Sequence, residues 1–109
     1  MLVPTEDDEQ AIVVQYMQLK NIPHWRTPNE TYTKSWKQKA KNKRLGVVPG
    51  VPDLFAIVNN KLIAIEMKRT KGSVTSQAQK DWIDKLNACG VQAHICKGAT
   101  EAIDFIETT

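Results

Sequence analysis

The sequence is poor in the residues that build most zinc, redox and histidine-based sites. It has two cysteines and two histidines. Cys89 and Cys96 lack the spacing of zinc ligands or of a redox pair, and we expect both to be small buried apolar residues. His24 and His94 have no partner at ligand spacing, so we predict no catalytic role for either. These shortages exclude zinc and thiol chemistry as a first explanation of the chain.

Long apolar runs are also missing. No segment approaches the roughly 20 apolar residues of a membrane span. The acidic start, residues 5–9, lacks the basic and apolar regions of a secretory signal. We therefore expect a cytoplasmic location and no membrane partner. A length of 109 residues suits one compact domain, residues 1–109, and is too short for two ordinary ones.

Acidic residues are absent from residues 34–44 (KSWKQKAKNKR), which hold six basic residues. The wider stretch 34–71 has a net charge of +8, whereas residues 1–33 and 72–109 have −3 and −2. A basic run is usually a solvated helix face or a disordered tract. We favour contact with nucleic acid, because lysine and arginine on phosphates release counterions. Trp36 interrupts the run, and it either stacks on a base or anchors the segment.

The chain is organised around a predicted β-hairpin with strands over residues 53–58 and 61–68. Asn59 and Asn60 lie between them, and asparagine tolerates the positive φ of tight turns. Apolar residues occur on both faces of the two strands, so we expect both faces to be covered. A two-residue loop pairs Val58 with Lys61, Ile57 with Leu62, Phe55 with Ala64, and Asp53 with Glu66.

Two carboxylates meet in this register. Asp53 and Glu66 would have Cβ atoms roughly 4.5–5.5 Å apart, and like charges at that distance are destabilising. A divalent cation would offset the repulsion. Lys68 shares the face because side chains alternate along a strand. A surface hairpin with charged ends is the alternative interpretation.

Caps and periodicity predict the other elements. They are a helix over residues 6–19 capped by Thr5, a short strand over 24–27, a helix capped by Ser76 with Gln79 completing a capping box, a strand over 91–96, and a last helix capped by Thr100. This order predicts an α/β fold in which helices cover both faces of a mixed central sheet. Two roles are open for Gln79. It completes the capping box, and a side chain at the start of this helix also reaches the acid-bearing face.

The motifs together resemble a known family. In chain order they are Glu6 and Gln10 in the first helix, the pair Trp25 and Arg26, GVPDLF over residues 50–55, IEMK over residues 65–68, and the S-x-x-Q-x-x-W pattern of Ser76, Gln79 and Trp82. With them the chain resembles the VRR-NUC family of the PD-(D/E)XK nuclease superfamily. The resemblance runs from about residue 6 to residue 106 and implies a restriction-endonuclease-like core.

The resemblance implies a role for each matched residue. Asp53 and Glu66 would be metal ligands, and the Met67 backbone carbonyl would be a third. Lys68 would orient or polarise the attacking water. Gln79 matches the family's glutamine on the helix beside the active site, and we count it with the catalytic residues.

A glutamate of the first helix also lies near the metal in this family. Both Glu6 and Glu9 fit, and the spacing to Gln10 slightly favours Glu6. The implied metal is Mg²⁺ or Mn²⁺, and no small-molecule cofactor is implied.

The implied activity is structure-selective cleavage of DNA at Holliday junctions, flaps or other branches, in repair or recombination. The chain resembles stand-alone phage and bacterial junction-cleaving enzymes, which work as homodimers, so we expect a bacterial or phage-infected cell. A preference for duplex or single-stranded DNA is an alternative, as is a non-catalytic nucleic-acid-binding module of the same fold. The residues expected to contact DNA are Arg26, Lys34, Lys37, Lys39, Lys41, Lys43, Arg44, Arg69 and Lys71.

Overall fold

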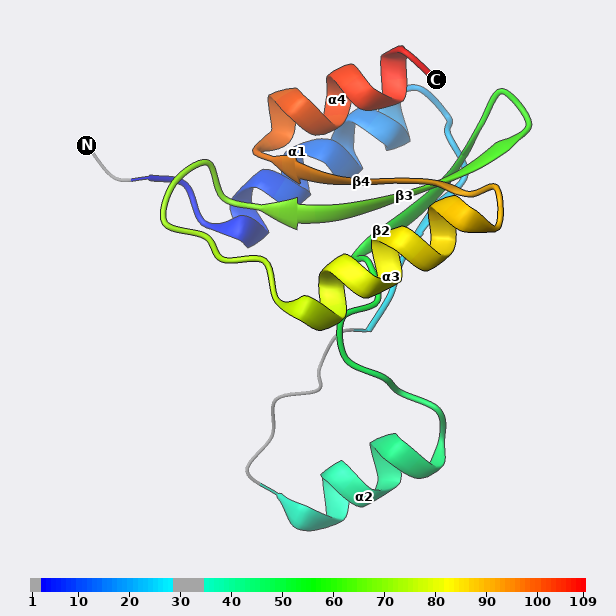
Figure 1. Ribbon diagram of the computed structural model, residues 1–109. Coiled ribbons are helices and arrows are strands. Elements are labelled where there is room, and N and C mark those ends of the chain that lie inside the picture. Colours follow the sequence, from blue (N-terminus) through cyan, green and yellow to red (C-terminus); the bar gives the residue numbers. More distant parts are fainter. Residues whose placement is uncertain (1–2, 29–34) are drawn as a thin grey trace.

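The predicted hairpin lies in the middle of a four-stranded sheet. In the computed structural model, which describes residues 3–28 and 35–109, this sheet is combined with four helices (Figure 1). The elements are α1 (Glu6–Leu19), β1 (His24–Arg26), α2 (Trp36–Arg44), β2 (Leu54–Val58), β3 (Lys61–Lys68), α3 (Gln77–Ala88), β4 (Gln92–Lys97) and α4 (Ala99–Glu107). Among the described residues, none of the helices is long and apolar enough to cross a membrane.

The turn between β2 and β3 sets the register of the hairpin. Asn59 and Asn60 have φ angles of 51° and 63°. Positive φ at both central residues is typical of the type I′ turn, whose twist matches that of the strands. The observed partners agree with the prediction, since Val58 pairs with Lys61, Ile57 with Leu62, and Phe55 with Ala64. The predicted register is confirmed.

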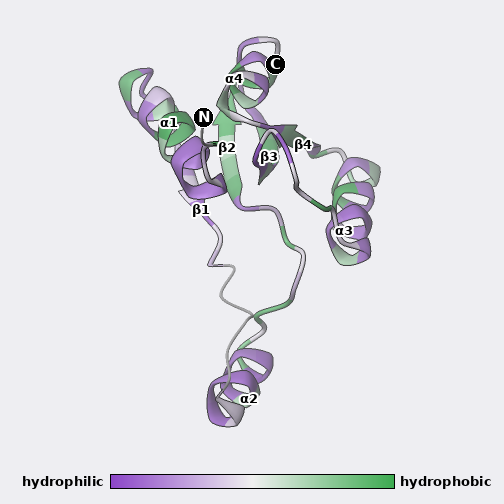
Figure 2. Ribbon diagram, turned by 90° about the vertical axis from the view of Figure 1, so that its left-hand side faces the viewer, coloured by the Kyte–Doolittle hydropathy of each residue, from purple (hydrophilic) through white to green (hydrophobic). Residues whose placement is uncertain are grey.

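The sheet has the strand order β1-β2-β3-β4, with two antiparallel pairs and a parallel pair between β3 and β4. Helices α1 and α4 pack together on one face, and α3 lies on the other (Figures 1 and 2). The first face contains the main core, which includes Val13, Met17, Leu54, Ala56, Ile63, Ile65, Met67, Cys96, Ala102 and Ile106. The predicted mixed sheet with helices on both faces is confirmed.

The expectation that both hairpin strands are covered on both faces is wrong for β2. Strand β3 is buried from Ile63 to Lys68, but Ile57 in β2 is 44% exposed. The reason is the position of α3, which packs against β4. The part of the sheet formed by β1 and β2 is therefore open on the face that bears Asp53 and Glu66.

The sequence predicts the N-terminal caps of α1 and α3 correctly, but not that of α4. Thr5 and Ser76 cap α1 and α3 as predicted, each within a capping box. The prediction of Thr100 as a cap is wrong, because α4 begins at Ala99. The N–H of Ala99 donates instead to Glu9 Oε2 at 2.5 Å, so a carboxylate from α1 caps α4. This cap crosses most of the chain, which is why local sequence does not show it.

The two cysteines lie in different environments. Cys96 is 2% exposed, and burial raises the pKa of its thiol to about 12. Cys89 is exposed at the end of α3, which corrects the expectation that both are buried.

We expect native protein at pH 8 to react rapidly with a thiol reagent only at the exposed Cys89. The buried Cys96 thiol should react slowly, because the thiolate is the reactive form and the pKa of Cys96 is raised. Counting modified thiols by mass spectrometry should give one without denaturant and two with denaturant. Cys89→Ser should remove the rapid reaction. Equal rates at both cysteines of the native protein would contradict the buried position of Cys96.

Candidate metal centre

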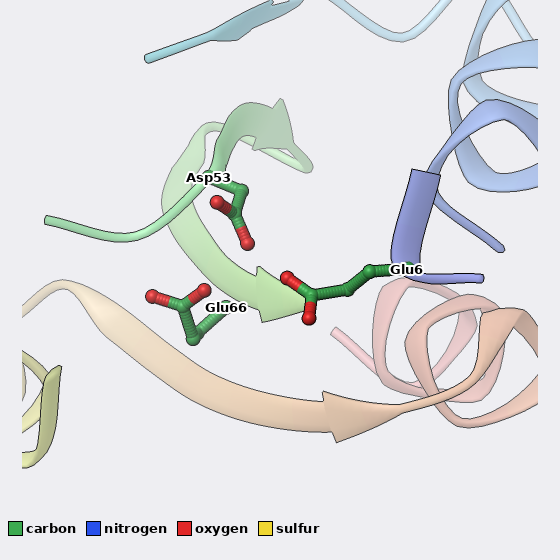
Figure 3. A group of neighbouring side chains, drawn as sticks. All are labelled: Glu6, Asp53 and Glu66. Carbon is green, nitrogen blue, oxygen red and sulfur yellow. The ribbon is translucent and has the colours of Figure 1, made fainter. Parts of the chain in front are cut away.

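Three carboxylates from distant parts of the chain converge beside the hairpin. Glu6 is the first residue of α1, Asp53 immediately precedes β2, and Glu66 lies in β3. One oxygen from each lies within 4.8 Å of the others, and Figure 3 shows the three side chains directed toward a common point. Three acids at this spacing repel one another unless protons or a cation compensate them. The geometry and the all-oxygen donor set fit a divalent cation.

Asp53 is fixed by its neighbours on two strands. Its Oδ2 accepts a hydrogen bond from the Met67 N–H at 2.8 Å, and its backbone carbonyl accepts one from the Thr27 N–H at 2.8 Å. The preceding Pro52 is fully buried. The carboxylate is therefore tied to β3, and its backbone is tied to the segment after β1.

Glu66 is the most deeply buried acid of the cluster, at 1% exposure. Its Oε1 has no hydrogen-bond partner among the described residues. Burial is the main reason that its pKa rises to about 10, and the hydrogen bond and negative charge of Asp53 raise it further, while Lys68 acts in the opposite direction. A buried oxygen without a partner is costly. A cation bound between the three acids would supply the missing partner.

Burial is also the main cause that raises the pKa of Glu6, and the nearby Lys68 opposes it. The Asp53 carboxylate adds a smaller upward shift of the pKa. The pKa values of two of the three acids are therefore raised, as expected where carboxylates are buried and crowded together.

Lys68 is 6% exposed and is held by two neutral acceptors. Its Nζ donates to Gln79 Oε1 at 2.9 Å and to the Val74 carbonyl at 3.0 Å. An ammonium group has three N–H donors, so one remains after these two bonds. The charge of Lys68 opposes the upward pKa shifts of Glu66 and Glu6, which places it beside the carboxylates.

Gln79 fills both roles that the sequence left open. Its Oε1 accepts from the Ser76 backbone N–H at 2.9 Å, and the same oxygen accepts from Lys68 Nζ. Ser76 Oγ in turn accepts from the Gln79 N–H at 3.2 Å. The capping box therefore holds the Gln79 side chain in place, and Gln79 in turn holds the Lys68 ammonium group.

Gly50 brings the loop before Asp53 close to α3. Its φ is +89°, and a Cβ atom there would lie 2.7 Å from the Ala78 carbonyl carbon. A side chain would clash with backbone, so the glycine permits the close approach. The loop and the helix that carries Gln79 are thus packed together next to the acids.

The structure separates the two first-helix glutamates. Glu6 joins the cluster, whereas Glu9 is 8% exposed and accepts the Ala99 N–H. Met67 has its side chain in the core and its N–H bonded to Asp53, and the role of its carbonyl stays a prediction.

The predicted DNA-contacting residues fall in three places. Arg69 lines a surface pocket together with Glu6 and Lys68, and Lys71 is exposed nearby in the same loop. Arg26 is exposed at the end of β1. Helix α2 carries its basic residues on an exposed segment away from the sheet, largely hydrophilic in Figure 2. Lys34 lies outside the described residues.

Sequence reasoning missed two features of this region. The Val74 carbonyl holds Lys68, and no sequence signal marks a backbone acceptor in a loop. The Trp25 ring stacks on Phe55 and is 48% exposed. The ring stack could have been predicted only from the pairing of β1 with β2. That pairing cannot be read from the sequence, because β1 has only three residues.

The VRR-NUC domain model matches residues 5–100 of the chain. The chain belongs to the VRR-NUC family. A solved structure described as a VRR_NUC domain protein is similar to it, with 26% sequence identity and a TM-score of 0.82, over 99% of this chain and 89% of the other. We found no match among curated proteins. VRR-NUC domains are nucleases, and in this member a possible metal-binding acidic triad accompanies the fold.

We expect Glu6→Gln to weaken Mn²⁺ binding by this VRR-NUC protein, because Glu6 contributes an oxygen to the cluster. The measurement is the rise in melting temperature with Mn²⁺ concentration, which reports binding to the folded state. Glu9→Gln should instead leave the Mn²⁺ response intact. It removes a negative charge at the start of α4, while its amide oxygen can still accept the Ala99 N–H, so the stability without metal should fall by about 0.5 kcal/mol.

Asp7→Asn is the matched control, since Asp7 is an exposed acid in the same helical turn. It should bind Mn²⁺ more like the wild type than Glu6→Gln does. A normal metal response in Glu6→Gln, with a lost response in Glu9→Gln, would reverse the assignment.

Proposed function

We propose that this VRR-NUC protein is a divalent-metal-dependent endonuclease that hydrolyses phosphodiester bonds in branched DNA. The observation that carries the proposal is the buried Glu66 oxygen, which has no hydrogen-bond partner within residues 3–28 and 35–109, in a carboxylate cluster that has Lys68 beside it. A purely structural site would pair such an oxygen or replace it with an apolar group.

The residues that would hold Mg²⁺ or Mn²⁺ are Asp53, Glu66 and Glu6, with the Met67 carbonyl as a further ligand. Carboxylate and carbonyl oxygens are the ligands these hard cations prefer. When bound, the cation supplies a more acidic water and neutralises charge on the phosphate. Asp53 and Glu66 contribute rigid positions, because both are held by strand backbone.

Lys68 orients the water that attacks the phosphorus atom. Two of its donors are occupied by Gln79 and Val74, so the ammonium group is fixed in direction. Water adds to phosphorus and gives up a proton to solvent, the bond to the leaving oxygen breaks, and that oxygen takes up a proton from solvent. The positive charge of Lys68 stabilises the negative charge that develops on the phosphate. Gln79 acts by holding the lysine.

Helix α2 would grip the DNA backbone. It carries five basic residues and no acid, and none of its residues is buried. Phosphate contacts fix position without reading sequence, which favours selection by DNA shape. A homodimer would provide two such centres for the two cuts of a four-way junction, and each copy would be one domain, residues 1–109.

Asp53→Ala, Glu66→Ala and Lys68→Ala should each reduce metal-dependent cleavage by about 100-fold or more, because each removes a charge needed at the reacting phosphate. The assay uses labelled single-stranded, duplex, flap and four-way-junction DNA, with Mn²⁺, with Mg²⁺ and with EDTA. Branched substrates should be cut fastest.

Asp84→Ala is the matched control, because Asp84 is an exposed acid on α3 outside the cluster. It should cleave at the wild-type rate. Cleavage by purified Glu66→Ala at the wild-type rate would rule out the mechanism. If plain duplex or single strands are cut fastest, the proposed branched substrate is wrong and the faster substrate takes its place.

Removing two basic side chains of α2 should weaken DNA binding for all sequences. Lys37→Ala with Lys41→Ala eliminates two phosphate contacts, so the slope of log affinity against log salt should become about 2 units shallower. Fluorescence anisotropy at several salt concentrations measures the slope.

The control is Lys20→Ala with Lys61→Ala, which changes the net charge equally. Lys20 borders a pocket that also reaches Asn59 at the hairpin turn, and Lys61 begins β3 at the same turn. This end of the hairpin is opposite to the one that carries Glu66. Equal changes of slope in the two double variants would place α2 outside the interface.

A further inference from the structure

Two aromatic rings form a short stack on the sheet. Trp25 in β1 and Phe55 in β2 are directly paired in the register. Their ring centroids lie 5.3 Å apart, and the planes differ by 5°. Phe55 is half-buried, whereas Trp25 is 48% exposed. Since one ring face of Trp25 meets Phe55, the exposure lies mainly on the rest of the indole, toward solvent at the edge of the sheet.

The stack lies on the same face as the metal centre. Phe55 pairs with Ala64, and side chains alternate along a strand, so Phe55 lies on the same face as Glu66, which is about 6.6 Å from Ala64 along β3. The Thr27 N–H bonds the Asp53 carbonyl at 2.8 Å, so the segment that carries Trp25 is anchored directly to a cluster residue. Helix α3 packs against β4 and leaves this part of the face open. A nucleotide whose phosphate lies at the acids thus has a base within reach of the indole.

From this juxtaposition we infer that Trp25 binds an unpaired nucleobase next to the phosphate that is cut. The indole continues the ring stack of Phe55, and the base adds a third ring. This inference rests on the proposed nuclease function and extends it, because it makes single-stranded character beside the cut a feature that the protein recognises.

The electrostatic setting favours a nucleic acid over an apolar partner. The exposed Arg26 follows Trp25 in β1 and pairs with Leu54, next to Asp53, and the central stretch of the chain has a net charge of +8. Every base has an aromatic face, so stacking on Trp25 is independent of sequence. A second copy of the chain would instead need a wider apolar contact, in which the neighbouring Ile57, 44% exposed, takes part.

The first test uses Trp25 as the reporter in a protein with Trp36→Phe and Trp82→Phe. Binding is measured in EDTA, so that no cleavage occurs, with a 12-nucleotide single strand and with the same sequence as a duplex. We expect the tryptophan emission to be quenched by the single strand and much less by the duplex. No quenching by saturating single strand would overturn the inference.

The second test compares affinities. Trp25→Leu should weaken binding of the single strand about 5- to 100-fold, the range for losing one stacked base. Duplex affinity should change by less than the single-strand affinity, and Trp25→Phe should restore most of the loss. Ile57→Ser is the matched control, which removes an exposed apolar side chain from the same face and should retain single-strand binding.

Equal losses for single strand and duplex would overturn the inference, as would an equal loss in Ile57→Ser. A change of oligomer mass on gel filtration in both Trp25→Leu and Ile57→Ser would assign the surface to a second copy. If Trp25→Leu does not fold, the quenching measurement decides alone. Absent cleavage with Mn²⁺, together with quenching, would refute the nuclease proposal and leave the base site standing.

Discussion

The repulsion among three buried or half-buried carboxylates is the constraint on which the rest of this structure depends. Glu66 lies in β3, and its Oε1 has no hydrogen-bond partner in the part of the chain that the structure describes. Burial, and then the hydrogen bond and negative charge of Asp53, raise its pKa. Packing of the apolar core alone does not require three carboxylates to lie together. The fold holds the Asp53 carboxylate with the Met67 N–H, and it carries Glu66 on the buried strand β3 and Glu6 on α1. A site of this kind is stable because its surroundings are rigid.

That rigidity comes from two local motifs, a helix cap and a hairpin turn, each of which also positions residues of the site. The Ser76 capping box begins α3, and its glutamine also holds Lys68. The hairpin turn at Asn59 and Asn60 fixes the register. The ladder ends with Leu54 opposite Ile65, and the next residues along the chain, Asp53 and Glu66, both belong to the cluster. Each local motif is therefore part of the site, which explains why a short chain can build one without a dedicated binding domain.

The hairpin, the capped helices and the family could be predicted from sequence because their signals are local. Asn59 and Asn60 define a turn, and Ser76 with Gln79 defines a helix start. The sequence favoured Glu6 over Glu9 only slightly, because both lie in one helical turn. The structure has Glu6 in the cluster and Glu9 bonded to the start of α4. The open face of β2 was also missed, since the sequence does not say over which strand α3 lies.

The link between Glu9 and Ala99 has a consequence for the order of folding. It joins the first helix to the last across 90 residues, and Glu6 sits one turn away on the same helix. Contacts of such long sequence separation form late, because the intervening loop must close first. Strand β4, which pairs in parallel with β3, must also be in place. We therefore expect the position of α1 to be fixed only after α4 has been synthesised, so a growing chain already carries Glu6, Asp53 and Glu66 but lacks the contact that holds Glu6 beside the other two.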